Sequence, residues 1–175
     1  LAAAVAARFG PAAMGAHHIA LQLWFFCAML LDALAIAAQS LVGTDLGAGR
    51  VAAARITARR IAVLGGVAGL MLGTVIGAAA FALPRLFTDD AEVLRQTTLV
   101  WPWFVGMMPL GGVVFALDGV LIGAGDVRFL RNLTLVATFG VFLPAIWLAY
   151  LLDLGLGGIW AGLTLLILVR LGATF

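Results

Sequence analysis

The sequence predicts an all-α membrane protein, a bundle of helices that cross a lipid bilayer. Mean hydropathy is +1.19, 65% of the residues are hydrophobic, and only 10% are charged. A soluble domain of this size must cover its surface with polar groups, and this chain has too few of them to do so. The few charged residues also divide the chain into long apolar runs, so we expect lipid to surround most of the protein.

Five apolar runs are long enough, or nearly so, to cross a hydrocarbon layer of ~30 Å, which takes about 20 residues of helix. They cover residues 19–42, 61–83, 99–122, 133–152 and 154–169. Residues 43–60 then form a connector, either solvated near lipid headgroups or lying on the membrane surface as a basic amphipathic helix. Leu1 to Arg8 look like the tail of an earlier helix, and the lack of an initiator Met and a charged leader predicts a fragment without a signal peptide.

The arginines predict how the helices are oriented. Seven lie in one set of alternate loops and three in the other: Arg50, Arg55, Arg59, Arg60, Arg128, Arg131 and Arg170 against Arg8, Arg85 and Arg95. The positive-inside rule therefore predicts a cytoplasmic connector and a cytoplasmic C-terminus. Five aromatic residues fall toward the ends predicted to be external, where such side chains collect: Trp101, Trp103, Trp147, Tyr150 and Trp160.

Small residues and prolines predict how the helices pack. Four glycines recur every fourth residue in the second run, at Gly65, Gly69, Gly73 and Gly77. We interpret this stripe as a face on which another helix packs closely, although a sliding surface is an alternative. Prolines at 102, 109 and 144 should kink the third and fourth runs, as packed bends or as part of a transport pathway.

Asp32 is the strongest candidate for function, because it lies within the first apolar run. It precedes Asp45 at the end of that run by 13 residues. This spacing places it ~20 Å deep in the membrane. A charged acid there costs about 2.5–3.5 kcal/mol, so it should face protein or water. Phe25 and Gln39, each seven residues away, share its helix face and complete a predicted surface for a proton, a metal cation or an organic cation.

Asp118 is a second candidate for binding the cation or the substrate, ~12 Å from the inner face by the same rise. A structural hydrogen bond to a neighbouring helix is an equally good interpretation. The neighbours His17 and His18 project in different directions and cannot share a metal, and the single Cys27 excludes a disulfide framework. We found no phosphate loop and no catalytic motif, so the sequence predicts neither an enzyme nor a cofactor.

Three segments resemble a known transporter family. GAHHIALQLWFFCAMLLDALAIAAQSLVGTDLGAGR (residues 15–50) resembles the eighth helix and following connector of multidrug and toxic compound extrusion (MATE) transporters of the DinF-like branch. LDGVLIGAGDVRF (117–129) is similar to the end of the tenth helix, and LPRLFTDDAEV (83–93) to the turn before that helix. The resemblance implies a C-terminal six-helix lobe, with its first helix truncated and the N-terminal lobe missing.

The resemblance also implies a function. It predicts a secondary antiporter in the bacterial cytoplasmic membrane that exports small organic, often cationic, compounds in exchange for H⁺ or Na⁺. The alternatives are a flippase for lipid-linked saccharides from the same superfamily and a membrane structural or assembly subunit. The expected partners are an organic substrate and the lipid bilayer, and the few charges give no reason to expect nucleic acid.

Overall fold

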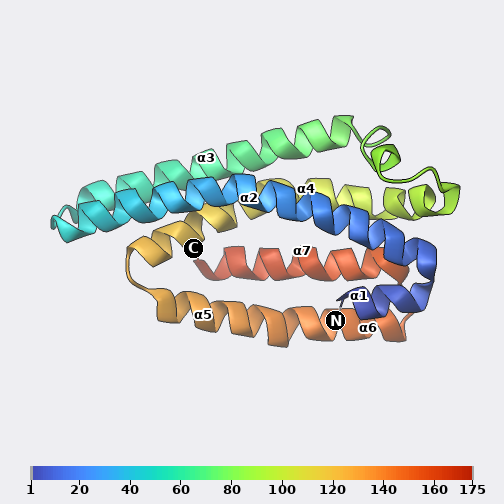
Figure 1. Ribbon diagram of the computed structural model, residues 1–175. Helices are drawn as coiled ribbons and strands as arrows, with labels where there is room; N and C mark the ends of the chain where they lie inside the picture. Colours follow the sequence, from blue (N-terminus) through green and yellow to red (C-terminus); the bar gives the residue numbers. More distant parts are fainter. Residues whose placement is uncertain (1, 175) are drawn as a thin grey trace.

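The protein is a bundle of helices that run side by side along one axis (Figure 1), in a computed structural model that describes residues 2–174. Five helical segments are long and apolar enough to cross a membrane: α2 (Pro11–Gly47), α3 (Val51–Ala78), α4 (Ala91–Gly123), the joined segment Val127–Leu151, and α7 (Gly155–Thr174). The joined segment consists of α5 (Val127–Leu135), the π-helical η3 (Val136–Phe142) and α6 (Leu143–Leu151). The predicted all-α membrane bundle is confirmed.

The bundle has two ends, which we name the Arg50 end and the Asp90 end. The Arg50 end, at the left of Figure 1, holds the turns at residues 48–50 and 124–126 and the C-terminus. The Asp90 end holds residues 79–90, with η2 (Pro84–Leu86), and the turn at 152–154. Both turns at the Arg50 end are short because a glycine adopts a left-handed conformation, with φ of 72° at Gly49 and 79° at Gly125.

The helices continue beyond the apolar runs, so the predicted connector is almost entirely helical. Of residues 43–60, only 48–50 lie outside α2 and α3. Asp45 holds this turn by accepting hydrogen bonds from Arg50 at 2.9 Å and from Thr57 of α3 at 3.3 Å. The difference arises because hydropathy marks the part of a helix that lies in hydrocarbon, whereas hydrogen bonding continues until a turn residue ends it.

The segment before α2 is short and irregular. It consists of α1 (Ala2–Ala6) and the 3₁₀ turn η1 (Ala7–Phe9). Gly10, with φ of 102°, separates it from α2, which begins at Pro11. Residues 2–8 of the predicted helix tail are therefore helical, and Leu1 lies outside the described residues.

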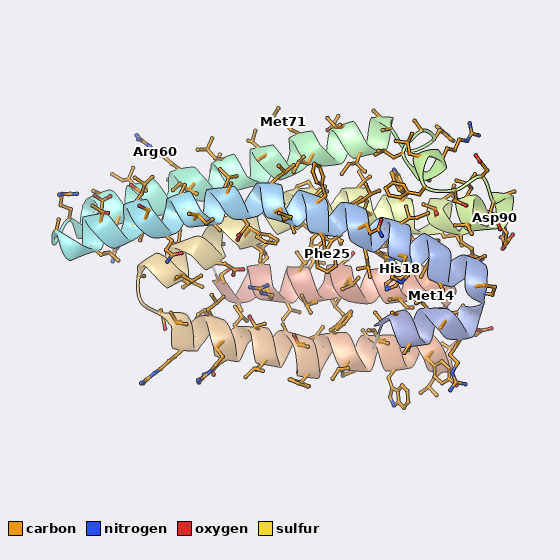
Figure 2. The ribbon with its side chains drawn as sticks, viewed as in Figure 1. Met14, His18, Phe25, Arg60, Met71 and Asp90 are labelled. Carbon is orange, nitrogen blue, oxygen red and sulfur yellow. The ribbon has the colours of Figure 1, made fainter. Side chains whose placement is uncertain are left out.

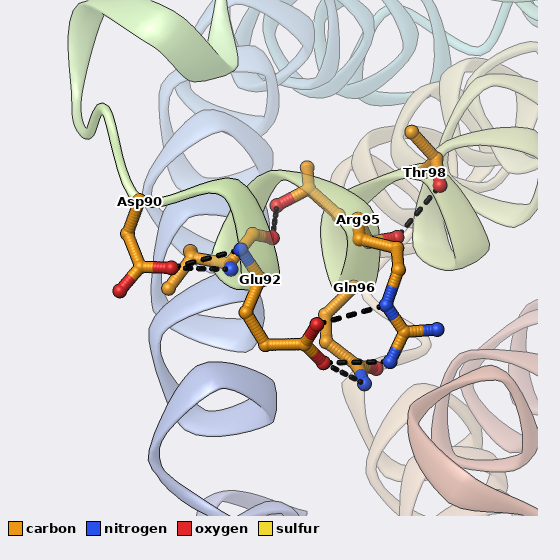
Figure 3. Close-up of polar contacts among 7 residues, drawn as sticks. Asp90, Glu92, Arg95, Gln96 and Thr98 are labelled. Atoms are coloured by element: carbon orange, nitrogen blue, oxygen red, sulfur yellow. Dashed lines mark hydrogen bonds and ion pairs between the residues drawn. The ribbon is translucent and has the colours of Figure 1, made fainter.

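At the Asp90 end, side chains fix the start of α4 (Figure 3). The Asp90 carboxylate accepts hydrogen bonds from the backbone N–H groups of Glu92 at 2.8 Å and Val93 at 3.2 Å. This N-cap satisfies donors that have no partner within the helix. Glu92 pairs with Arg95 one turn later, at 2.6 Å. Because both side chains of that pair are exposed, the N-cap contributes more to fixing the helix start than the pair does.

The glycine stripe of α3 packs against α4, which confirms its interpretation as a packing face. Three of its members are buried: Gly65, Gly69 and Gly73. A Cβ atom added at Gly69 would lie 2.9 Å from backbone atoms of both Met108 and Pro109. A Cβ atom added at Gly65 would strike the carbonyl of Gly112. The two backbones are therefore in direct contact, as in small-xxx-small helix pairs.

A second glycine face, absent from our sequence analysis, joins α4 to α2. A Cβ atom added at Gly119 would strike the carbonyl of Ala35, and one added at Gly123 would lie 2.6 Å from the carbonyl oxygen of Gln39. Gly119 and Gly123 are four residues apart, so they occupy one stripe of α4. Helix α4 thus lies against α2 and α3 through two separate backbone contacts.

The prolines act differently from one another. Helix α4 continues through Pro102 and Pro109. Pro109 cannot donate to the Val105 carbonyl one turn earlier, and that oxygen lies 3.1 Å from the position of a Cβ atom at Gly73. The expected disturbance at Pro144 appears before the proline, as the π-helical η3, where the Leu143 N–H donates to the Thr138 carbonyl.

The core between α2, α4 and α7 is rich in aromatic side chains. Phe104 packs edge to face against Trp101 and Trp160, with ring centroids 5.8 and 5.9 Å apart. Trp101 also donates a hydrogen bond of 3.1 Å to the Ile76 carbonyl of α3. These two tryptophans are buried, because their rings fill space between helices. Trp103, Trp147 and Tyr150 are exposed.

Candidate functional site

An ion pair inside the bundle joins Asp118 of α4 to Arg170 of α7. One terminal nitrogen of Arg170, Nη2, donates to both carboxylate oxygens of Asp118 at 2.7 Å. Both side chains are largely shielded, with exposed fractions of 18% for Arg170 and 20% for Asp118. Arg170 was predicted to follow the fifth span, but it lies within α7, whose last described residue is Thr174. One interpretation of Asp118 requires a hydrogen-bond donor on a neighbouring helix, and Arg170 is such a donor.

Asp32 lies near the middle of α2 and is exposed, as are Phe25 and Gln39. Phe25, labelled in Figure 2, has 63% of its surface exposed. The seven-residue spacing places all three side chains along one helix face. The adjoining side of α2 is buried and includes Leu31, Ala35 and Ala38. The predicted face therefore exists, and within the described residues no other helix covers it.

The two acids lie close together across the contact between α2 and α4. Asp32 is one turn before Ala35, and Asp118 immediately precedes Gly119, which contacts Ala35 backbone to backbone. Asp32 and Asp118 therefore flank this backbone contact from two neighbouring helices, and Arg170 of α7 pairs with Asp118. The structure thus brings together three charged side chains, from α2, α4 and α7.

This cluster is suited to cations that bind by charge. Carboxylates within a low-dielectric region attract a proton, a metal ion or an organic cation strongly. Among residues 2–174, no three His, Cys, Asp or Glu side chains gather closely enough to hold a metal ion.

His18 is exposed, but His17 is buried against Trp160 of α7, with 6.0 Å between ring centroids. His17 is thus a core residue.

A hollow lies elsewhere, between residues 80–85 and the Asp90 end of α4. Its volume is about 570 Å³, and Phe81, Trp101, Pro102 and Val105 contribute to its mostly apolar lining. Arg85 and Arg95 are its charged lining residues. Neither Asp32 nor Asp118 reaches it, so the hollow and the acidic cluster are separate features.

Comparison with known proteins identifies the family. The MatE family model matches residues 1–151. The chain belongs to the MatE family. Among the relatives of this MatE chain, Protein DETOXIFICATION 44, chloroplastic, of Arabidopsis thaliana is 36% identical over 99% of the chain and 33% of that protein. Multidrug and toxin extrusion protein 2 of Mus musculus is 27% identical over 86% of the chain and 26% of that protein.

A solved structure has the same fold. The crystal structure of the eukaryotic MATE transporter AtDTX14 matches with a TM-score of 0.86 and 25% identity, over 92% of this MatE chain and 36% of that one. The predicted resemblance to MATE transporters is therefore confirmed, and the chain is a multi-pass membrane protein of this family. The MatE chain spans about a third of the length of curated relatives such as Protein DETOXIFICATION 44, chloroplastic.

Proposed function

We propose that the protein containing this chain is a secondary antiporter, not an enzyme. It exports small organic, often cationic, compounds in exchange for H⁺ or Na⁺. The chain contributes one lobe, and a second lobe completes the pathway. Asp32, Gln39 and Phe25 line that pathway, while Asp118 lies beside it and is held by Arg170. No cofactor is needed, because the ion gradient supplies the driving force.

The exposure of Asp32 carries this proposal. A carboxylate halfway along a membrane helix costs about 2.5–3.5 kcal/mol when it faces lipid, so it is kept where it meets water, protein or a cation. The lobe itself does not cover Asp32. The aromatic ring of Phe25 on the same face suits an organic cation, since the faces of such rings attract positive charge.

We also propose the finer assignments that the sequence motifs suggested. The three quoted segments favour the DinF-like branch and a bacterial cytoplasmic membrane. The arginine distribution favours a cytoplasmic Arg50 end, and with it a cytoplasmic C-terminus. A lipid-linked saccharide flippase is less favoured, because a diphosphate needs unpaired positive charge and Arg170 is already paired with an acid.

The test is ion-driven export by the intact protein with Asp32→Asn. This change keeps the size and hydrogen-bonding capacity of the side chain and removes its charge. Efflux of a fluorescent organic cation should follow an imposed pH or sodium gradient in the wild type and lose most of that dependence in Asp32→Asn. Asp89→Asn, which changes an exposed acid near the start of α4, is the matched control. Gradient-driven export that is unchanged in Asp32→Asn would show that the acid is structural.

A further inference from the structure

The contact between Arg170 and Asp118 uses little of what an arginine offers. Arg170 Nη2 alone bridges both carboxylate oxygens, while Arg170 Nε is buried and has no hydrogen-bond partner among residues 2–174. The strongest arginine–carboxylate pairs are forks in which two nitrogens each bind one oxygen. The observed pair has both bonds from one nitrogen and lacks the second donor nitrogen of the fork, so a competing cation can displace Arg170 from Asp118 at a lower cost.

The cluster has an unequal charge balance. Arg170 pairs with Asp118, and Asp32 lies one helical turn before Ala35, whose backbone Gly119 contacts. Two carboxylates and one guanidinium give a net charge of −1, from −2 and +1. Within the membrane an uncompensated charge is costly. One monovalent cation makes the cluster neutral, whereas a second would leave it positive.

We infer that Arg170, paired with Asp118 beside the backbone contact of Ala35 and Gly119, serves as a built-in positive charge. Arg170 thereby limits the cluster of Asp32, Asp118 and Arg170 to one monovalent cation. It is a positioning residue, since it acts by setting the charge that the arriving cation meets. This inference rests on the proposed cation transport and adds a stoichiometry to it. Without Arg170 the cluster carries −2; without the Asp118 carboxylate it carries no net charge.

The inference is tested by charge-matched variants of the intact protein, with tetraphenylphosphonium as a monovalent organic probe and calorimetry to measure its binding. Charges a few ångströms apart interact by several kcal/mol at an effective dielectric of about 20, so one unit of charge should change affinity by about tenfold or more. Arg170→Gln should bind the probe about tenfold more tightly than wild type, and Asp118→Asn about tenfold more weakly.

Two further variants separate charge from structure. The double variant Asp118→Asn/Arg170→Gln restores the net charge of −1 and should return the affinity to within about threefold of wild type. Arg170→Lys keeps the charge and should also bind as wild type does. Arg128→Gln, which removes an exposed arginine from the neighbouring helix α5, should leave binding unchanged.

The outcome is decided by the order of the affinities. If Asp118→Asn leaves Arg170 without its carboxylate partner and the variant does not fold, the double variant must still bind the probe about tenfold more weakly than Arg170→Gln. Equal binding by these two variants, or failure of Arg170→Lys to match wild type, overturns the inference.

A parallel efflux assay keeps the two proposals apart. Probe binding in the expected order without gradient-driven export would refute antiport alone, and gradient-driven export without that order would refute the role of Arg170 alone.

Discussion

Replacing Gly69 with Ala should push α3 away from α4. The added Cβ atom would lie 2.9 Å from atoms of Met108 and Pro109, whereas ordinary contact begins at 3.4 Å. The shortfall is about 0.5 Å at these two atoms and larger at the Met108 carbonyl oxygen, which the Cβ atom would strike. All of these atoms belong to the α4 backbone, so no side chain can rotate to make room. The helices must separate, and their other close contacts then weaken.

The same substitution at Gly77 provides the control. There the nearest atoms are the methyl groups of Val105, at 3.6 and 3.8 Å, so a Cβ atom fits without movement. Both variants gain the higher helix propensity of Ala, and the difference between them isolates the clash. Overpacking costs typically about 1–3 kcal/mol, and Gly69→Ala should be less stable than Gly77→Ala by that amount.

The free energy of unfolding can be measured by titrating the intact protein in mixed micelles with SDS and following helicity by circular dichroism. Gly69→Ala should unfold at a lower SDS fraction than Gly77→Ala. If the two variants unfold together, the close backbone contact does not stabilise the bundle and the packing argument is wrong.

Two further predictions concern the attachment of α4 and the orientation of the bundle. Trp101→Phe removes the hydrogen bond to the Ile76 carbonyl and should cost about 1 kcal/mol in the same titration; Trp103→Phe, at an exposed ring, should cost less, and equal losses would contradict this role of the bond. In intact cells that express the protein with Cys27→Ala, an impermeant maleimide should label Asp90→Cys and not Ala48→Cys. Labelling of Ala48→Cys would contradict the proposed cytoplasmic Arg50 end.

The existence of the five membrane helices was predictable, and their ends were not. Apolar length alone identifies a span, because a helix must satisfy its backbone inside the hydrocarbon layer. Outside that layer water satisfies the backbone equally well, and hydropathy carries no further information. Helix α2 therefore continues to Gly47, and the left-handed Gly49 makes the turn that follows.

The packing faces were only half predicted. The stripe on α3 follows from its four-residue spacing, but the sequence does not distinguish Gly69, which touches backbone, from Gly77, which does not. Gly119 and Gly123 carry the same spacing signal, yet their partner is a carbonyl of α2 that no local pattern reveals. The spacing predicts that one face of a helix carries small residues, and only the fold shows which helix packs against that face.

The acids were found from the sequence, whereas Arg170 was missed. Its partner Asp118 is 52 residues away, and their meeting depends on how α7 is rotated against α4. A single basic residue near the end of an apolar run looks like an interfacial anchor, because such side chains commonly reach toward the headgroups. The useful signal was that Arg170 and Asp118 are opposite charges, each within an otherwise uncharged stretch of helix.

The position of α4 also has a consequence for biosynthesis. The ribosome makes α2 and α3 before α4, so the carbonyl of Ala35 and the glycines of α3 exist for a time without the helix they later touch. Acyl chains must fill that groove until α4 leaves the translocon, and their release then favours docking. A Gly69 variant, in which α4 docks less closely, should therefore prolong the lifetime of the undocked α2–α3 hairpin.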